Sequence, residues 1–180
     1  MQLPGKIVPI LEQTVRSPLL PMGFPVEIWR ADDHRKWIEA FTELGRLLFA
    51  SDIPEESLPR AYAQVAYIFD WESQCQFSGW HAFANRAEVM GRVIESYEEV
   101  GLEQEAVALK AALKAWIQSN GDVDATTAAY DLHRHQYSID LDRLEHLVCY
   151  FRRQCRSPVL RVRQRDITIR SSGPLRIGTV

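Results

Sequence analysis

The residues of this sequence that could hold a metal ion are His81, His133 and His135, together with nearby acids. Imidazole and carboxylate groups bind zinc, and a zinc-bound water can hydrolyse a substrate. On a helix, however, His133 and His135 would point about 200° away from each other, because each residue turns the helix by about 100°. The zinc-binding helical pattern His-Glu-x-x-His is absent from the sequence. A small metal-dependent hydrolase using these histidines is therefore an alternative hypothesis, and we expect no metal or other cofactor.

Nucleophilic catalysis has equally little support. The chain contains no Gly-x-Ser-x-Gly elbow, no phosphate-binding P-loop and no Gly-x-Gly-x-x-Gly pattern. Its three cysteines, Cys75, Cys149 and Cys155, match neither a disulfide framework nor the Cys-x-x-Cys pairs of a zinc site. Acids spaced like Asp70 and Glu72 do not share a face of a helix. The sequence therefore predicts reduced thiols and a protein that is not an enzyme.

Charge is distributed unevenly along the chain. The formal net charge of −3 combines about −10 in residues 1–150 with about +7 in residues 151–180, where eight arginines accompany one aspartate. No aromatic residues alternate with those arginines, and the acidic body would repel a phosphate backbone, so direct binding of nucleic acid is not expected. The Arg-rich segment could instead lie on the acidic body of its own chain or of a second copy. A homodimer is therefore one expected assembly.

Hydropathy indicates a single soluble domain. The composition is 46% hydrophobic and 25% charged, which is typical of globular proteins. No apolar run approaches the roughly 18 residues that a membrane span needs. The first residues also lack the long apolar stretch of a secretory signal. We expect a cytoplasmic protein that does not associate with membranes.

Helical periodicity organises most of the chain after a proline-rich arm of residues 1–30. Five prolines up to Pro25 leave room for only a short helical piece around Ile7–Val15. Further predicted helices follow a cap at Asp32 or Asp33 and run from about Ser51 toward Trp71, with a break at residues 76–79. Others cover Trp80–Val100, Glu103–Gln118, Thr126–Gln136 and the stretch from Ser138 or Asp140 to about Gln154. A left-handed cap is expected at Gly101 and a turn at residues 119–121. The sequence predicts an all-α fold, an irregular multi-helix bundle in residues 31–154.

The C-terminal residues 155–180 show a different pattern. After Pro158, apolar residues alternate with arginines in residues 159–163, and β-branched residues recur in residues 167–169. A period of two is typical of a strand, and two isolated strands are marginally stable in water. This Arg-rich tail is therefore expected to form either a short β-hairpin or a disordered segment.

The stretch from residue 71 to residue 85 carries a resemblance to a known family. It reads as the end of a helix, a small-residue turn at residues 78–79, and a new helix that directs two aromatic residues into the core. It resembles the motif of the bacterial DNA-mimic protein family, in which a helix with spaced acids runs into an Asn-Gly-Gly-Phe turn followed by Gln-Phe and Asn. The matching positions are Glu72 for the first acid, Gly79 for the second glycine, Trp80 for the Phe, Phe83 for the second aromatic residue and Asn85 for the Asn.

The resemblance extends over roughly residues 40–153 and includes departures. Gln74 stands at the second acid, Phe77 at the Asn, Ser78 at the first Gly and Ala82 at the Gln. The resemblance implies an all-helical and often dimeric protein without known catalysis. Its named member presents carboxylates in place of DNA phosphates to a DNA-binding regulator, and relatives resemble immunity proteins that sit beside bacterial toxins.

The charge pattern supports the same hypothesis. From Glu95 to Glu145 the chain has 11 acids against four lysines and arginines, and an acidic surface attracts cationic partners. The first candidates for a partner-binding acidic face are Glu95, Glu98, Glu99, Glu103 and Glu105. The motif residues Glu72, Gly79, Trp80, Phe83 and Asn85 are expected to hold the structure. The sequence thus predicts a non-enzymatic binding protein for a basic partner, either a DNA-binding regulator or a toxin.

Overall fold

The computed structural model describes residues 5–15 and 34–170, with the backbone alone for residues 8, 12, 15 and 156–170. Within these residues every regular element is helical and no strand forms, which confirms the predicted all-α fold. The helices are α1 (Ile7–Val15), α2 (His34–Phe49), α3 (Arg60–Ser78), α4 (Ala82–Asn85), α5 (Met90–Glu99), α6 (Glu103–Gln118), α7 (Val123–Asp131) and α8 (Asp140–Arg170). Short 3-10 helices lie between them: η2 (Glu55–Ser57), η3 (Gly79–His81), η4 (Ala87–Val89) and η5 (Gln136–Ser138).

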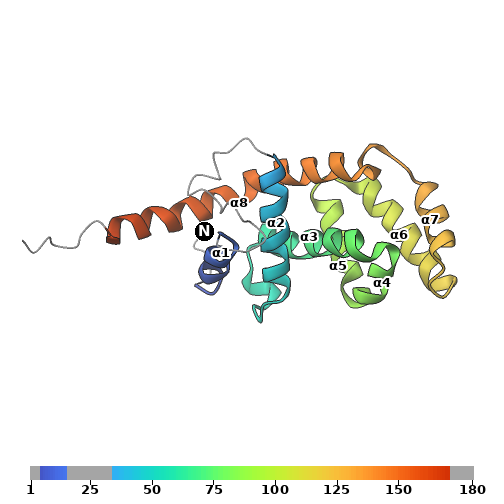
Figure 1. The fold of residues 1–180 in the computed structure, drawn as a ribbon, viewed down its shortest axis with the longest axis horizontal. Coiled ribbons are helices and arrows are strands. Elements are labelled where there is room, and N and C mark those ends of the chain that lie inside the picture. The colour runs from blue at the N-terminus through green and yellow to red at the C-terminus, as the bar shows by residue number, and fades with distance from the viewer. Residues whose placement is uncertain (1–4, 16–33, 171–180) are drawn as a thin grey trace, which may run out of the picture.

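Helix α3 occupies the middle of the molecule. It packs against α2, α5 and α8, while α6 packs on α5 and α7 packs on α6 (Figure 1). The proline-rich arm predicted for residues 1–30 lies outside the described residues apart from residues 5–15, where α1 forms as expected and packs on α2. No helix in the described part of the chain has the length and apolar character that crossing a bilayer requires.

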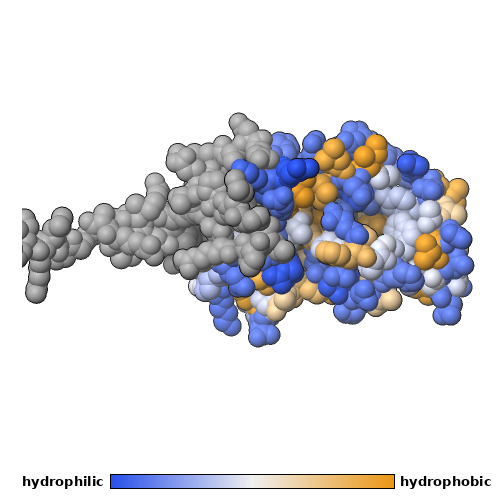
Figure 2. Space-filling view, viewed as in Figure 1, coloured by the Kyte–Doolittle hydropathy of each residue, from blue (hydrophilic) through white to orange (hydrophobic). Residues whose placement is uncertain are grey.

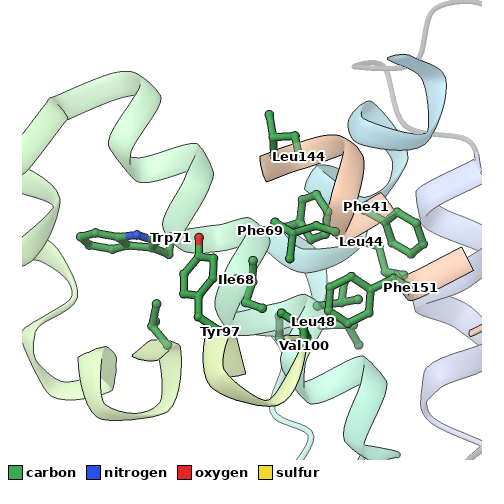
Figure 3. Close-up of a cluster of buried hydrophobic side chains, with 14 of the residues drawn as sticks. Phe41, Leu44, Leu48, Ile68, Phe69, Trp71, Tyr97, Val100, Leu144 and Phe151 are labelled. Carbon is green, nitrogen blue, oxygen red and sulfur yellow. The ribbon is translucent and has the colours of Figure 1, made fainter. Parts of the chain in front are cut away.

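Three phenylalanines from different helices form the centre of the core (Figure 3). Phe69 of α3 lies with its ring centroid 5.5 Å from that of Phe41 on α2 and 5.9 Å from that of Phe151 on α8. Phe41 and Phe151 complete the triangle with 5.9 Å between their centroids. Burying rings of this size contributes strongly to stability, so this cluster fixes α2 and α8 on α3.

Gly45 of α2 allows the close approach of α2 to α3. A Cβ atom at this position would lie 2.8 Å from the Cβ atom of Phe69 and 2.8 Å from the carbonyl oxygen of Val65. Real Cβ atoms do not come this close to other heavy atoms, so any side chain would push the two helices apart. The crossing of α2 and α3 therefore depends on this glycine.

The helix predicted for Trp80–Val100 is interrupted, and this prediction was wrong in its detail. Helix α3 continues to Ser78, and the next residues form η3, α4 and η4 before α5 begins. Gly79 reverses the chain at φ 54°, a conformation that favours glycine. Arg86 then leaves the helical conformation at φ −132° and reaches back to the Asp70 carboxylate of α3. Tertiary contacts therefore divide a segment whose apolar spacing is helical.

The boundaries of α7 also differ from the prediction of a helix over Thr126–Gln136. Helix α7 begins at Val123, because the Asp122 side chain accepts a hydrogen bond of 2.7 Å from the backbone N–H of Ala125 and caps the helix. It ends at Asp131. The left-handed cap at Gly101 (φ 83°) and the turn at Asn120 and Gly121 are confirmed.

The C-terminal residues form neither a hairpin nor a separate unit up to Arg170. Helix α8 continues through Pro158 to Arg170, past the end predicted near Gln154. Cys155 is buried in the core, so the helical body extends beyond residue 154. A helix satisfies its backbone hydrogen bonds within itself and is already nucleated here, whereas two strands without a third partner are marginal. The period of two in the sequence was therefore misleading.

Candidate functional site

The predicted acidic face on α5 is largely neutralised by cations of the same chain. The Arg60 guanidinium of α3 donates hydrogen bonds of 2.5 Å and 2.7 Å to the two carboxylate oxygens of Glu99. These bonds lower the pKa of Glu99. Glu95 lies 3.1 Å from Arg92 and 3.8 Å from Arg60. These carboxylates are engaged in exposed ion pairs and are not a bare anionic surface.

The other three acids predicted for this face differ in their surroundings. Glu98 forms an ion pair with Lys110, with 2.5 Å between its Oε1 and the Lys110 Nζ. Glu105 is buried with 2% of its surface exposed, so its prediction as a surface residue was wrong. Glu103 is exposed and has no ion pair within the described residues. A partner could therefore reach an uncompensated charge at Glu103 among these five acids.

A buried ion pair joins α3 to the first turn of α8. Arg143 donates from Nε to Oε1 of Glu72 at 2.5 Å and from Nη2 to Oε2 at 2.9 Å. The Tyr97 hydroxyl of α5 donates to the same Oε1 at 2.5 Å. Burial alone would lower the pKa of Arg143, but the Glu72 carboxylate raises it on balance. Glu72, which the sequence motif singled out, thus holds three helices together.

A second buried carboxyl lies close to this ion pair. Glu105 Oε2 accepts a hydrogen bond of 2.8 Å from the Tyr130 hydroxyl and lies 3.1 Å from Nε2 of His135. The other ring nitrogen of His135, Nδ1, accepts from the backbone N–H of Tyr137 at 3.2 Å, so Nε2 carries the proton and donates to Glu105. Burial raises the pKa of Glu105 to about 7, although Arg143 lowers it. Burial lowers the pKa of His135.

The structure does not bring the three predicted metal-binding histidines together. His81 packs edge-on against Trp116 with 5.5 Å between ring centroids, His133 is exposed, and His135 is engaged with Glu105. Within the described residues no group of three or more His, Cys, Asp or Glu side chains could hold a metal ion. No contact therefore assigns a metal-binding role to these histidines.

The three cysteines are free. Burial raises the pKa of the Cys155 thiol to about 12 and also raises the pKa of the Cys75 thiol. A thiol is nucleophilic as the thiolate, so both side chains are unreactive near neutral pH.

Of the remaining motif residues, Trp80 and Phe83 lie in the packing between α3, α4 and α7. The rings of Trp80 and Phe83 stack with 5.6 Å between centroids, and the Trp80 indole N–H donates to Thr127 Oγ1 at 2.9 Å. Gly79 provides the chain reversal described above. Asn85 is exposed, and its backbone carbonyl accepts from Arg86 at 2.9 Å. These contacts position helices.

An exposed segment at the opposite end from α1 combines apolar and acidic side chains. We call residues 131–142, from the end of α7 to the first turn of α8, the apolar–acidic segment. Leu132 is 84% exposed, Leu141 is 59% exposed and Ile139 is 54% exposed. Asp131, Asp140 and Asp142 alternate with them in the sequence. Figure 2 shows hydrophobic side chains among hydrophilic ones over α7 and the start of α8.

Sequence reasoning missed this segment as a surface. Its first half was assigned to a helix ending at Gln136, and its second half was assigned to the start of the last predicted helix. The available signal was the repeated neighbouring of Asp with Leu or Ile at residues 131–132 and 139–142. A pattern this short does not show whether its apolar side chains are buried or exposed, and only the fold shows that they are exposed.

A shallow hollow lies near η2, between α3 and α5. It is lined by Glu55, Glu56, Leu58, Arg60, Ala63 and Arg92. Arg60 and Arg92 are both paired with acids of this chain, so the hollow carries no uncompensated cation for an anionic ligand.

Comparisons with protein families, with curated proteins and with solved structures found no match to this chain. The resemblance to the DNA-mimic family therefore depends on the residues quoted for it.

Proposed function

We propose that this chain is a non-catalytic, cytoplasmic binding protein whose apolar–acidic segment engages a basic protein partner. The observation that carries this proposal is the exposure of Leu132, Ile139 and Leu141 beside Asp131 and Asp142, whereas the third acid of the segment, Asp140, is already paired with Arg143. Apolar side chains rimmed by polar residues are typical of protein interfaces. The acids attract a cationic partner, and the apolar side chains contribute the area that such a partner would bury.

The segment is held in place before a partner arrives. Arg143 donates from Nη1 to the carbonyl oxygen of Tyr137 at 2.8 Å, and the rings of Tyr137 and His146 lie 5.0 Å apart. His135 caps η5 through Tyr137 and Ser138. An ordered binding segment loses less conformational entropy on association than a disordered one. This anchoring supports a role in recognition.

Two kinds of basic partner fit the proposal. A DNA-binding regulator would present the cationic surface that normally contacts phosphates, and a toxin that acts on nucleic acid would present a cationic substrate cleft. The DNA-mimic and immunity roles that the sequence resemblance implies are therefore both retained as forms of the same proposal. Both roles would use the apolar–acidic segment, and both would bind a protein with a cationic surface.

A basic amphipathic peptide tests the proposed surface. The probe is a fluorescein-labelled helix of arginines and leucines, and its affinity is measured by fluorescence anisotropy at about 50 mM and about 500 mM salt. We expect Asp131→Lys with Asp142→Lys to weaken binding about tenfold or more at low salt, and less at high salt, because salt screens exposed charges. Leu132→Ser, which removes the apolar side chain without changing the charge, is expected to weaken binding at both salt concentrations.

A matched control is available near η2, between α2 and α3. Asp52 and Glu56 are exposed acids near η2, and Asp52→Lys with Glu56→Lys makes the same change in net charge. This control should bind the peptide within about twofold of the unaltered protein. Equal weakening by the control pair and by the segment pair would show that net charge alone attracts the peptide, and would remove the proposed surface.

We also propose self-association through α8. This helix has 31 residues, and at about 1.5 Å per residue its Arg-rich second half lies roughly 20–45 Å along the helix axis from its own first turn. Figure 1 shows that half of α8 extending away from the helical body. The first half carries Asp140, Asp142 and Glu145, so two copies of α8 in antiparallel orientation would bring the acidic end of each helix near the Arg-rich end of the other.

Reversing the charges in each half of α8 tests this assembly, and light scattering after size-exclusion chromatography measures the mass of each variant. We expect a dimer for the unaltered chain. Arg161, Arg163 and Arg165 changed to Glu should give a monomer, as should Asp140, Asp142 and Glu145 changed to Lys, because each variant places like charges opposite each other. Mixing the two variants should restore a dimer. A monomeric unaltered chain, or a mixture that stays monomeric, would contradict the antiparallel arrangement.

A further inference from the structure

The two hydrogen-bond partners of the buried Glu105 carboxyl both come from the segment that covers it. Tyr130 lies in the last turn of α7, and His135 follows in the connection to η5. The side chains of Glu105 and His135 are 3% and 6% exposed. If α7 and this connection moved away, the carboxyl would lose both partners and reach water. The burial of Glu105 therefore depends on the position of the cover, which we define as residues 123–138.

Ionisable groups from every surrounding element face this carboxyl. They are Glu72 and Cys75 of α3, Tyr97 of α5, Tyr130 of α7, His135 before η5, and Asp140 and Arg143 of α8. Arg143 is the nearby cation, but it is already bound to Glu72 and Asp140. The negative charges of Glu72 and Asp140 therefore offset its effect on Glu105. Burial is the dominant influence on this carboxyl.

We propose that the cover loosens when Glu105 loses its proton, so that proton binding regulates the apolar–acidic segment. The physical reason is linkage: a carboxyl that is buried under the closed cover and solvated under the open one binds its proton more tightly in the closed form. Losing the proton must then favour opening. The inference concerns regulation of the proposed binding surface and rests on that proposed function, because residues 131–138 belong to both.

The pH range follows from the direction of each shift. The pKa of Glu105 is raised from 4.5 to about 7, so its contribution to closure is fully present below pH 4.5 and is lost as the pH rises through about 7. The pKa of His135 is lowered from 6.5, so its contribution is present above pH 6.5 and is lost as the pH falls. In mildly acidic solution a rise in pH has opposite effects through the two groups, because it weakens closure through Glu105 and strengthens closure through His135. Above neutral pH His135 stays uncharged, so only Glu105 contributes to any further change in closure.

Amide hydrogen exchange measures the opening of the cover without any partner. The reporters are the hydrogen-bonded amides of His133, Arg134 and Ser138, corrected for the intrinsic effect of pH on exchange. Glu105→Gln keeps the shape and an acceptor oxygen but removes the titration, while His135 still titrates in both proteins. Exchange gives an equilibrium constant for opening of the cover in each protein. We expect this constant for the unaltered protein, divided by the constant for Glu105→Gln, to rise about tenfold between about pH 6 and about pH 8.5.

A second measurement does not depend on the variant folding. Carbon-13 labelling of glutamate side chains allows the Glu105 carboxyl to be titrated by NMR in the unaltered protein, and we expect a pKa about two units above that of an exposed glutamate. An exchange ratio that does not change with pH, or a Glu105 carboxyl that titrates like an exposed glutamate, would overturn the inference. If the ratio of opening constants rises tenfold but the protein does not bind the basic peptide, the proton-dependent opening of the cover is supported. In that case only the proposed function is overturned.

Discussion

Replacing Arg143 by Met is expected to lower the free energy of unfolding by about 3–5 kcal/mol. The substitution leaves the Glu72 carboxylate buried with the Tyr97 hydroxyl as its remaining partner. It also removes the donors to Asp140 and to the carbonyl oxygen of Tyr137. Leaving a buried charge without its partner lowers the free energy of unfolding far more than doing so at the surface, because no water replaces the lost hydrogen bonds. Urea denaturation followed by circular dichroism gives the change directly.

Two further variants isolate the reason for this effect. Glu72→Leu combined with Arg143→Met removes both charges, and it should recover a large part of the lost stability because no charge is left unpaired. Arg92→Met is the matched control, since Arg92 pairs with Glu95 at an exposed position, and it should leave stability nearly unchanged. A loss for Arg143→Met no greater than that for Arg92→Met would contradict the importance of the buried pair.

Replacing Gly45 by Val is expected to lower the free energy of unfolding by about 3 kcal/mol. Its Cβ atom would meet the Phe69 Cβ atom and the Val65 carbonyl oxygen, each at 2.8 Å. Both are part of α3 near its backbone, so neither can rotate away. The helices must separate, and the contact between the Phe41 and Phe69 rings is then weakened. Thermal denaturation of the purified variant measures the loss.

Gly91 provides the control for a glycine within a helix. It lies in α5, and a Cβ atom there would meet nothing within 4 Å. Gly91→Ala should therefore raise stability by about 0.5 kcal/mol, because alanine reduces the freedom of the unfolded chain and favours helix. A similar result for the two positions would mean that α2 and α3 tolerate separation.

The apolar spacing in the sequence was sufficient to predict the main helices. The stripe of Trp37, Phe41, Leu44 and Leu48 is buried along α2, as the period of a helix requires. Helix α6 occupies Glu103–Gln118 as predicted, and Gly101 and Gly121 adopt positive φ at the turns. These features depend on residues within a few positions of one another. Local sequence determines them.

The candidate site was much less predictable. Glu103 and Glu105 share the first turn of α6, where acids are favourable because of the helix dipole, and both were expected at the surface. The packing of α7 on α6 places Tyr130 and His135 over Glu105 and leaves Glu103 exposed. An acid in the first turn of α6 is thus exposed at residue 103 and buried at residue 105, although the sequence pattern is the same for both.

The helical class, the positions of most helices and the acidity of the body are all encoded locally in the sequence. Which acids are neutralised, which carboxyl is buried and which apolar side chains remain exposed depends on how the helices pack. The reason is the distance along the chain between partners. Arg60 is 39 residues from Glu99, and Arg143 is 71 residues from Glu72. Charge pairs of this kind form only after the helices pack, so no local pattern reveals them.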